Sequence, residues 1–424
     1  MLKEISIVNF KSIRSEVTFS MEADADRVHE HPDHLLEVGD NHLLKVTSMY
    51  GPNGGGKTNV LLAILMVKNL FFSGENMMMS PQQICCVFSE DKYVEETVFF
   101  VTDQYEIGYR FKILPTLTEK NNLNPFTGIQ QRVYYGTYDI LEEEVSFRKI
   151  HEEEFHRLFT RNQEGEIESE SFSQIGILEN LKLSKNKTVV NYVFNTFANT
   201  HAELQECLAV IRDLACEILR INELTLGNVQ IDEKILGVIQ LHKRQLISLL
   251  NGVDIRIKDI RLYKEGNYYP VFFVREIESG GKAIEQEISL SEESAGTQKV
   301  FWIFVNVLRS IQSPNIFLCD DMNALLHPKL FRAIIQLFTS VENQTSQLIF
   351  NSHDLINMDK DLFRRDEIWF VYRDENYSSC AIPLSNIVNY KGEQIRKDAK
   401  YSKQYLEGKY GADPFIQKGL NWHA

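Results

Sequence analysis

The residues with the clearest chemistry form a short glycine-rich segment, Gly51 to Thr58, which reads Gly-Pro-Asn-Gly-Gly-Gly-Lys-Thr. It matches the phosphate-binding pattern G-x-x-x-x-G-K-[ST] without a gap. Glycines let a tight loop bring several backbone N–H groups close to phosphate oxygens, and Lys57 adds a compact positive charge. The Thr58 hydroxyl is suited to bind Mg²⁺. The residues expected to hold a nucleoside triphosphate are Asn53, Gly54, Gly55, Gly56, Lys57, Thr58 and Asn59.

The segments on either side of this loop have the character that such a site requires. Leu43 to Tyr50 is expected to be a strand, and Val60 to Leu70 is a strongly apolar helix. The N-terminus of that helix carries a partial positive charge and would point at the phosphates. A chance glycine turn is the alternative, and the flanking strand and helix argue against it.

A second group of candidates follows an apolar strand, Asn315 to Cys319, which ends in Asp320 and Asp321. This resembles a Walker B strand, in which Asp320 would hold the Mg²⁺ shell through water and Asp321 would polarise the attacking water. Asp321 stands where that motif usually has Glu, and its side chain is one methylene shorter. We therefore expect slow hydrolysis and long-lived nucleotide binding. A buried strand with two capping acids is the alternative.

Ser294 and Gly296 stand at the start of an apolar helix, Ala295 to Ile311, in the pattern S-x-G-x-x-K. A hydroxyl, a glycine that permits close approach and a helix N-terminus together form an anion site. The segment resembles the ABC signature motif, which in that class reaches the γ-phosphate held by the other subunit. Taken alone, the motif is equally well a capped helix start, because Ser is a favoured N-cap residue.

His353 follows a strand, Gln347 to Asn351, that comes one strand after the paired carboxylates. In ABC ATPases a His at this place contacts the γ-phosphate and senses its loss. Imidazole suits that task because it can donate a hydrogen bond at neutral pH. A structural His at a strand end is the alternative. Leu326-His327-Pro328 resembles the D-loop region of RecF-like ATPases.

The order of these motifs is that of ABC-type ATPases: phosphate loop, insertion, signature, Walker B strand and switch His. RecA and AAA+ ATPases place the Walker B strand far closer to the phosphate loop and lack the signature. Together with Arg365 to Phe370 and Tyr405 to Pro414, the motifs resemble the AAA_15/AAA_21 group of bacterial ABC-type ATPases, of the SMC, RecF and OLD kind. The RloA and abortive-infection ATPases are near this group.

Two details of the nucleotide site depend on the resemblance alone. Phe10-Lys11-Ser12 is similar to the opening of SMC and RecF heads, which implies that Lys11 touches the nucleotide. The Q-loop glutamine stays open among Gln82, Gln83 and Gln104.

The resemblance implies an ATPase that uses ATP and Mg²⁺ as a homodimer or higher homo-oligomer, with each ATP between the phosphate loop of one copy and the signature of the other. It also implies a sensor or scaffold role in anti-phage defence beside a separate nuclease effector of Toprim or HNH type. Nucleic acid or a phage component would be a further partner. A RecF/SMC-like DNA-repair ATPase that binds DNA directly is the alternative. The large insertion and the Leu-His-Pro turn do not suit a transporter subunit.

We expect an α/β fold: an ABC-type P-loop head with a mixed sheet flanked by helices and an antiparallel β subdomain. Residues 1–145 and 256–424 would form the two halves of the head. Residues 146–255 would be a mostly helical insertion, with helical periodicity at His201 to Leu219 and Glu233 to Leu250. We expect the polar stretch Arg27 to Asp40 to be a surface loop, with His29, His31, Asp33 and His34 solvated rather than bound to metal. The acidic runs near Glu142 and Glu152 are expected to be a solvated helix face.

Composition limits the remaining function classes. Lys and Arg number 45 against 59 Asp and Glu, a net charge of −14, which disfavours a general nucleic-acid binder. The six cysteines show no zinc-type spacing and predict reduced thiols in a cytoplasmic protein. The N-terminal stretch lacks the apolar core of a signal peptide, and no run approaches the roughly 18 apolar residues of a membrane span.

Overall fold

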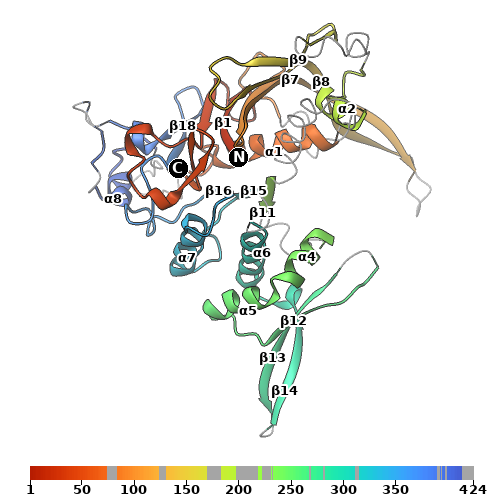
Figure 1. Cartoon of the computed structure of the whole chain (residues 1–424). Coiled ribbons are helices and arrows are strands. Elements are labelled where there is room, and N and C mark those ends of the chain that lie inside the picture. The colour runs from red at the N-terminus through yellow and green to blue at the C-terminus, as the bar shows by residue number, and fades with distance from the viewer. Residues whose placement is uncertain are drawn as a thin grey trace, which may run out of the picture.

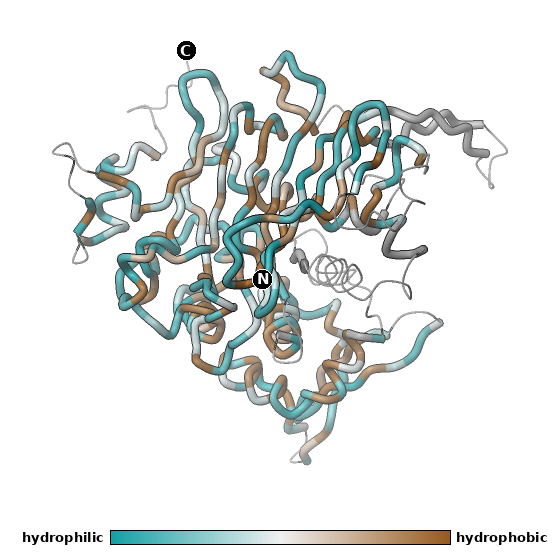
Figure 2. Tube along the Cα trace, turned by 45° about the horizontal axis from the view of Figure 1, so that its top comes forward, coloured by the Kyte–Doolittle hydropathy of each residue, from teal (hydrophilic) through white to brown (hydrophobic). Residues whose placement is uncertain are grey.

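The computed structural model describes residues 1–73, 84–123, 130–169, 183–196, 218–221, 231, 233–266, 269–279, 282–310, 315–388, 392, 394–396 and 399–412. Two large sheets face each other across helix α1, Lys57–Ser73 (Figure 1). A smaller sheet projects away from them. Apolar residues follow the inner strands and helices, and hydrophilic residues follow the outer loops (Figure 2).

A six-stranded sheet carries the predicted motifs, in the order β11-β15-β16-β5-β17-β18. Neighbouring strands pair in parallel except for β17 and β18. One antiparallel pair beside four parallel pairs makes the sheet mixed, which confirms the expected α/β fold. The strands are β5 Val46–Tyr50, β11 Ile218–Ile221, β15 Asn315–Cys319, β16 Ser346–Asn351, β17 Ile368–Arg373 and β18 Ser379–Pro383.

Both faces of this sheet are covered, and successive residues of each inner strand enter different cores. In β15, Ile316 and Leu318 belong to the core that contains α1. Phe317 and Cys319 belong to the core that contains α6, Ala295–Ser310, and α7, Pro328–Thr339. A sheet covered on both faces needs apolar residues at every position, which explains the unbroken apolar runs.

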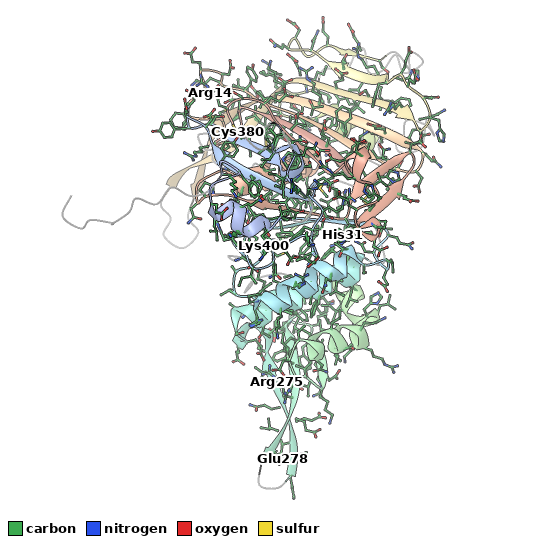
Figure 3. All side chains as sticks on the ribbon, turned by 90° about the vertical axis from the view of Figure 1, so that its left-hand side faces the viewer. Arg14, His31, Arg275, Glu278, Cys380 and Lys400 are labelled. Carbon is green, nitrogen blue, oxygen red and sulfur yellow. The ribbon has the colours of Figure 1, made fainter. Side chains whose placement is uncertain are left out.

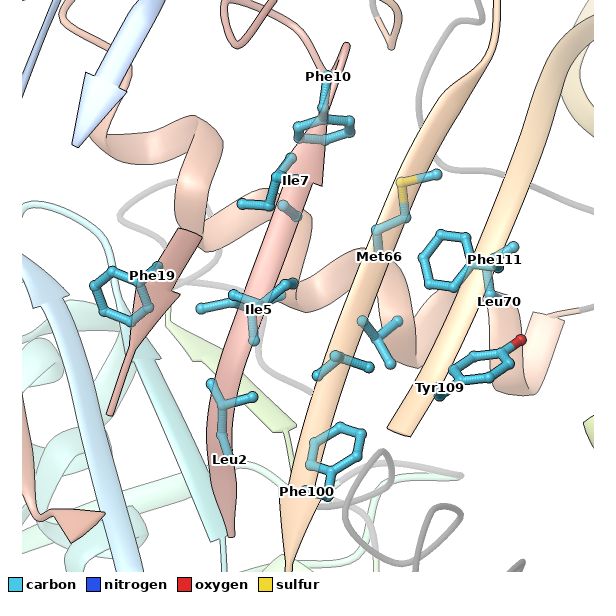
Figure 4. Close-up of a cluster of buried hydrophobic side chains, with 14 of the residues drawn as sticks. Leu2, Ile5, Ile7, Phe10, Phe19, Met66, Leu70, Phe100, Tyr109 and Phe111 are labelled. Atoms are coloured by element: carbon cyan, nitrogen blue, oxygen red, sulfur yellow. The ribbon is translucent and has the colours of Figure 1, made fainter. Parts of the chain in front are cut away.

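The other face of α1 packs on a seven-stranded antiparallel sheet in the order β10-β9-β8-β7-β6-β1-β2. Figure 4 shows Ile5 and Ile7 of β1 and Phe100 of β6 in the same cluster as Met66 and Leu70 of α1. Strands β6 and β7 form an antiparallel hairpin. The strands are β1 Leu2–Val8, β2 Val17–Ser20, β6 Val94–Val101, β7 Tyr105–Leu123, β8 Gln130–Lys149, β9 His156–Arg161 and β10 Ile167–Glu168.

The prediction of a helix near Glu142 and Glu152 is wrong, because residues 142–149 belong to β8 and residues 152–154 lie between β8 and β9. Glu152, Glu153 and Glu154 are exposed as expected, but Glu143 is not. Glu143 lies in β8 and is only 1% exposed. Its carboxylate accepts hydrogen bonds from the backbone N–H groups of Val189 (2.7 Å) and Val190 (3.2 Å), so burial leaves it satisfied. These bonds cap helix α2, Val189–Thr196.

Helices do occur later in the expected insertion. They are α4, Glu233–Leu241, and α5, Lys243–Gly252, which confirm the periodicity from Glu233 to Leu250. Within the predicted helix at 201–219, residues 201–217 lie outside the described residues, and residues 218–219 belong to β11. The division into residues 1–145, 146–255 and 256–424 stays a prediction.

The projecting sheet consists of β12, Asp259–Leu262, β13, Val271–Ser279, and β14, Lys282–Ser289. Figure 3 shows its hairpin, labelled at Arg275 and Glu278, extending away from the large sheets. The remaining elements are β3 Leu35–Val38, β4 Asn41–Leu44, α8 Tyr401–Leu406 and the short 3₁₀ turns Ala25–Arg27, Pro32–His34, Leu290–Glu292 and Leu384–Asn386. None of the helices in the described ranges is long and apolar enough to cross a membrane.

Buried charged groups fasten residues 24–34 to the start of β17. Arg365 pairs with Glu30 at 2.6 Å, and His34 lies 2.9 Å from Glu367. Arg364, which pairs with Asp366 at 2.6 Å, donates to the Glu30 carbonyl oxygen. Arg27, Glu30 and His34 are all less than a tenth exposed. The prediction of a solvated loop from Arg27 to Asp40 is therefore wrong in part: Arg27, Glu30 and His34 are buried and residues 35–38 form β3, whereas His29 and Asp33 are exposed as expected. The same pairs explain the charged start of the stretch from Arg365 to Phe370.

Candidate nucleotide-binding site

The glycine-rich loop joins the end of β5 to the start of α1, as predicted. It wraps around the buried Lys57 ammonium, which donates hydrogen bonds to the carbonyl oxygens of Gly51 (3.0 Å) and Pro52 (3.1 Å). Glycine is needed at Gly51, which has a φ of 146° and where a Cβ would lie 2.0 Å from the Val371 carbonyl oxygen. The loop is thus pressed against β17 as well as held by its own lysine.

The acidic side of the site comes from the two strands on one flank of β5. Thr58 Oγ1 at the start of α1 donates to Asp320 Oδ1 at 3.0 Å, directly after β15. Asn351, the last residue of β16, donates to the same carboxylate oxygen and accepts from the Asp321 N–H at 2.6 Å. Asn351 was not among the residues predicted from the sequence. Its place at a strand end two residues before His353 was the available signal.

Asp321 and His353 lie next to each other at the mouth of the site. His353 Nε2 is 4.0 Å from Asp321 Oδ1, and both side chains are nearly half exposed. Partial burial and then the Lys57 charge lower the pKa of His353, and Asp321 opposes the shift. The imidazole is therefore neutral at pH 7 with one N–H to donate. Burial also lowers the pKa of Lys57, and Asp321 and Asp320 oppose that shift.

The start of α6 is tied to the loop that follows Asp321. Ser294 Oγ accepts from the Thr297 N–H at 3.1 Å, so the helix cap is present, and the role of Ser294 as an anion site stays a prediction. A Cβ on Gly296 would lie 2.9 Å from the Leu325 carbonyl oxygen. The buried Lys299 ammonium donates to the carbonyl oxygen of Asp321 at 2.8 Å. These contacts join the signature-like segment to the carboxylates of the same chain.

Two serines on the opposite flank of the loop were also missed. Ser12 Oγ accepts from the Asn59 side chain at 2.6 Å and from Ser379 Oγ at 2.7 Å. Ser379 Oγ lies 2.6 Å from the Gly55 carbonyl oxygen. The N-terminal turn and β18 thus support the phosphate loop from the side away from the carboxylates.

The backbone N–H groups of Lys11 and Gln104 donate to residues outside the phosphate loop. Lys11 adjoins Ser12, and its N–H donates to the Ile84 carbonyl oxygen at 2.6 Å, so its contact with a nucleotide stays a prediction. Gln104 lies in the exposed turn between β6 and β7, where its N–H donates to Thr102 Oγ1. Gln82 and Gln83 lie outside the described residues.

The donor set fits Mg²⁺. A carboxylate and a hydroxyl oxygen are hard ligands, and Mg²⁺ in such sites is completed by phosphates and water. Asp320 and Thr58 provide these two oxygens 3.0 Å apart, beside the buried Lys57. Among the residues that the structure describes, no group of three or more His, Cys, Asp or Glu side chains could hold a metal by itself.

Several solved structures are similar to the chain. An SMC head bound to the C-winged helix domain of ScpA is 14% identical and has a TM-score of 0.44 over 90% of this chain and 97% of that one. The SMC head domain from Thermotoga maritima is 14% identical with a TM-score of 0.40, over 90% and 98%. The Smc head domain with an extended coiled coil from Pyrococcus furiosus, bound to the C-terminal domain of ScpA, is 12% identical with a TM-score of 0.41, over 90% and 95%.

No curated protein matches the sequence. The model of one protein family, described as "AAA domain, putative AbiEii toxin, Type IV TA system", matches residues 46–359. That range runs from the first residue of β5 through the phosphate loop, Asp320 and His353. It covers well over half of the chain, and the chain therefore belongs to this family of AAA ATPases.

Proposed function

We propose that the chain binds ATP with Mg²⁺, hydrolyses it slowly, and acts as a nucleotide-dependent switch that controls a separate nuclease effector in anti-phage defence. One observation carries the nucleotide part of this proposal. The buried Lys57 ammonium and the adjacent Thr58 meet residues from two distant segments: Asp320 after β15 and His353 after β16. The ATPase family supports the same conclusion.

Each side chain has a role that follows from its place. The Lys57 ammonium would leave the loop carbonyls for the β- and γ-phosphate oxygens. Thr58 and Asp320 would hold Mg²⁺, which when bound neutralises charge on those oxygens. Asp321 would orient the attacking water, and His353 would donate its N–H to the γ-phosphate. Asp321 reaches one methylene less far than the Glu usual at this place, which supports slow turnover.

We also propose that two copies complete each other's sites. Ser294 is exposed at the start of α6, where a helix N-terminus favours an anion. Leu325, in the loop after Asp321, is 59% exposed, and Ile356, three residues after His353, is 74% exposed. Apolar side chains around a polar site favour burial against a second copy. Ser294 and Gly296 of one copy would then contact the ATP held by the other.

The family description, which names a putative toxin of a toxin–antitoxin system, supports the defence role. Direct DNA binding in the manner of a repair ATPase is the second candidate, and the net charge of −14 weighs against it. A titration with duplex DNA at several salt concentrations separates the two, because direct binding to phosphates weakens steeply with salt. A nuclease gene in the neighbouring reading frame would support the effector.

The nucleotide part is tested by ATP titration and turnover of the wild type and four variants. Lys57→Ala should lose ATP binding, whereas Lys329→Ala, which removes an exposed lysine of α7, should bind as the wild type does. Asp321→Ala should bind ATP without turnover and accumulate as a dimer. Asp321→Glu should turn over faster than the wild type. Full ATP affinity in Lys57→Ala would show that the site assignment is wrong.

A further inference from the structure

Two aromatic rings are stacked on each other at the surface. Phe88 and Tyr377 have ring centroids 5.8 Å apart and an interplanar angle of 27°. Phe88 is 48% exposed and Tyr377 is 62% exposed, and the adjacent Val87 is 79% exposed. Covering exposed apolar side chains with another apolar surface lowers the free energy, because it removes apolar area from water. A stacked pair that is open on its outer side can accept a third flat ring.

Tyr377 has an energetically unfavourable backbone conformation. Tyr377 has a φ of 60°, in the left-handed region, where Gly or Asn is favoured and a bulky residue is rare. It lies in the turn between β17 and β18, which Asp374 closes by accepting from the N–H groups of Asn376 (2.9 Å) and Ser378 (2.8 Å). The exposed ring of Tyr377 on a strained backbone position motivates the hypothesis of a functional contact.

Tyr377 belongs to a segment that contacts the phosphate loop, and Phe88 belongs to a segment that contacts the N-terminal turn beside this loop. Tyr377 comes two residues before Ser379, whose hydroxyl contacts the Gly55 carbonyl oxygen. Phe88 comes two residues after Cys86, whose N–H donates to the Asn9 carbonyl oxygen at 3.3 Å. The N-terminal turn lies between the two segments, since the Arg14 N–H also donates to Ser378 Oγ (3.0 Å). Figure 3 shows Arg14 beside Cys380 of β18.

The strand order indicates on which flank of β5 each end of a bound nucleotide lies. Asp320 and His353 follow β15 and β16, on one flank of β5, whereas Tyr377 follows β17 on the other flank. The γ-phosphate and Mg²⁺ belong on the carboxylate flank. The nucleoside must therefore leave the loop toward β17 and β18. Asn59, at the start of α1, is bonded to Ser12 on that same flank.

We propose that Phe88 and Tyr377 form the platform on which the base of the bound nucleotide stacks, so that the site takes a purine nucleoside triphosphate. This inference rests on the proposed nucleotide site. The stacking free energy becomes more favourable as the area of the ring system increases, so the larger purine binds more tightly than a pyrimidine. Stacking also needs no hydrogen bond from the base edge, which suits two side chains that offer ring faces.

The test compares ATP, UTP and inorganic tripolyphosphate, each with Mg²⁺, by calorimetric titration. The variant Phe88→Ala/Tyr377→Asn removes both rings without adding strain, because Asn is tolerated in the left-handed region. Tyr377→Phe keeps the ring. Phe155→Ala is the matched control, because it removes another exposed aromatic side chain, 39% exposed, directly before β9. The double variant should bind ATP about tenfold more weakly and tripolyphosphate as the wild type does.

Wild-type protein and the two controls should bind ATP more tightly than UTP, and the double variant should lose most of this preference. Unchanged ATP affinity in the double variant overturns the platform. An equal loss for tripolyphosphate also overturns it, because the rings would then act on the loop rather than on a base. If the wild type binds neither ATP nor tripolyphosphate, the nucleotide site itself is wrong, and the platform fails with it.

Discussion

Replacing Gly56 by Ala tests whether contact with β18 shapes the phosphate loop. Gly56 has a φ of +113°, and a Cβ there would lie 2.2 Å from Ser379 Oγ and 2.8 Å from Ser379 Cβ. Ser379 is not free to turn away, because its hydroxyl bonds to the Gly55 carbonyl oxygen at 2.6 Å and to Ser12 at 2.7 Å. The added methyl group must therefore displace either the loop or the start of β18.

The expected magnitude has two parts. A non-glycine residue at this φ costs about 1–3 kcal/mol. Forcing one extra methyl group into a packed contact costs a further ~1–3 kcal/mol. We expect Gly56→Ala to lower the free energy of unfolding by roughly 2–6 kcal/mol, together with weaker ATP binding because the loop amides move.

Gly54→Ala is the matched control, because Gly54 also has a positive φ, +74°, but a Cβ there would meet nothing within 4 Å. Gly54→Ala should therefore lower the free energy of unfolding only by the cost of the positive φ. Adding Ser379→Gly to Gly56→Ala removes the clash and should recover the packing cost. Urea unfolding and ATP titration of all four proteins measure both effects. Equal losses for Gly54→Ala and Gly56→Ala, or no recovery with Ser379→Gly, would refute the reasoning.

Three further predictions concern buried or partly buried charges. Burial raises the pKa of Glu143 to about 7, so the folded chain binds a proton more tightly than the unfolded chain, and stability should decrease as pH rises from about 4.5 to 7. Glu143→Gln should remove this pH dependence of the urea midpoints measured across that range. An unchanged pH dependence would show that another group causes it. Because the lowered pKa of His353 leaves its imidazole neutral at pH 7, His353→Gln keeps a neutral donor and should retain more ATP turnover than His353→Ala, which should lose about a hundredfold. Wild-type turnover in both variants would remove His353 from the reaction, and an equal loss in both would show that a neutral donor is not sufficient. Arg364→Met leaves Asp366 buried without its partner and should lower the free energy of unfolding by about 3–5 kcal/mol, whereas Arg364→Met/Asp366→Leu should recover part of that loss. An equally unstable double variant would show that packing rather than the unpaired charge sets the cost.

The long acidic stretch shows where a local pattern fails. Glu142 to Glu144 were expected on a solvated helix, yet Glu143 shares a face of β8 with Val145 and Phe147 and is buried. Its carboxylate is satisfied by N–H groups of α2, 46 and 47 residues further along the chain. No pattern within a short window can reveal a buried acid whose partners are that distant. Strand β14 was missed because most of its residues are exposed.

The sequence alone was sufficient to place the phosphate loop and the parallel strands that carry the carboxylates and His353. A phosphate loop is built from consecutive residues, and its glycines and lysine are dictated by local backbone geometry. Strands that are buried on both faces are recognisable in the sequence as unbroken apolar runs. Only the tertiary structure showed Ser12, Asn351 and Ser379 around this loop. Those residues act across separations of 31 to 367 positions, through contacts that the sheet order creates and no local pattern encodes.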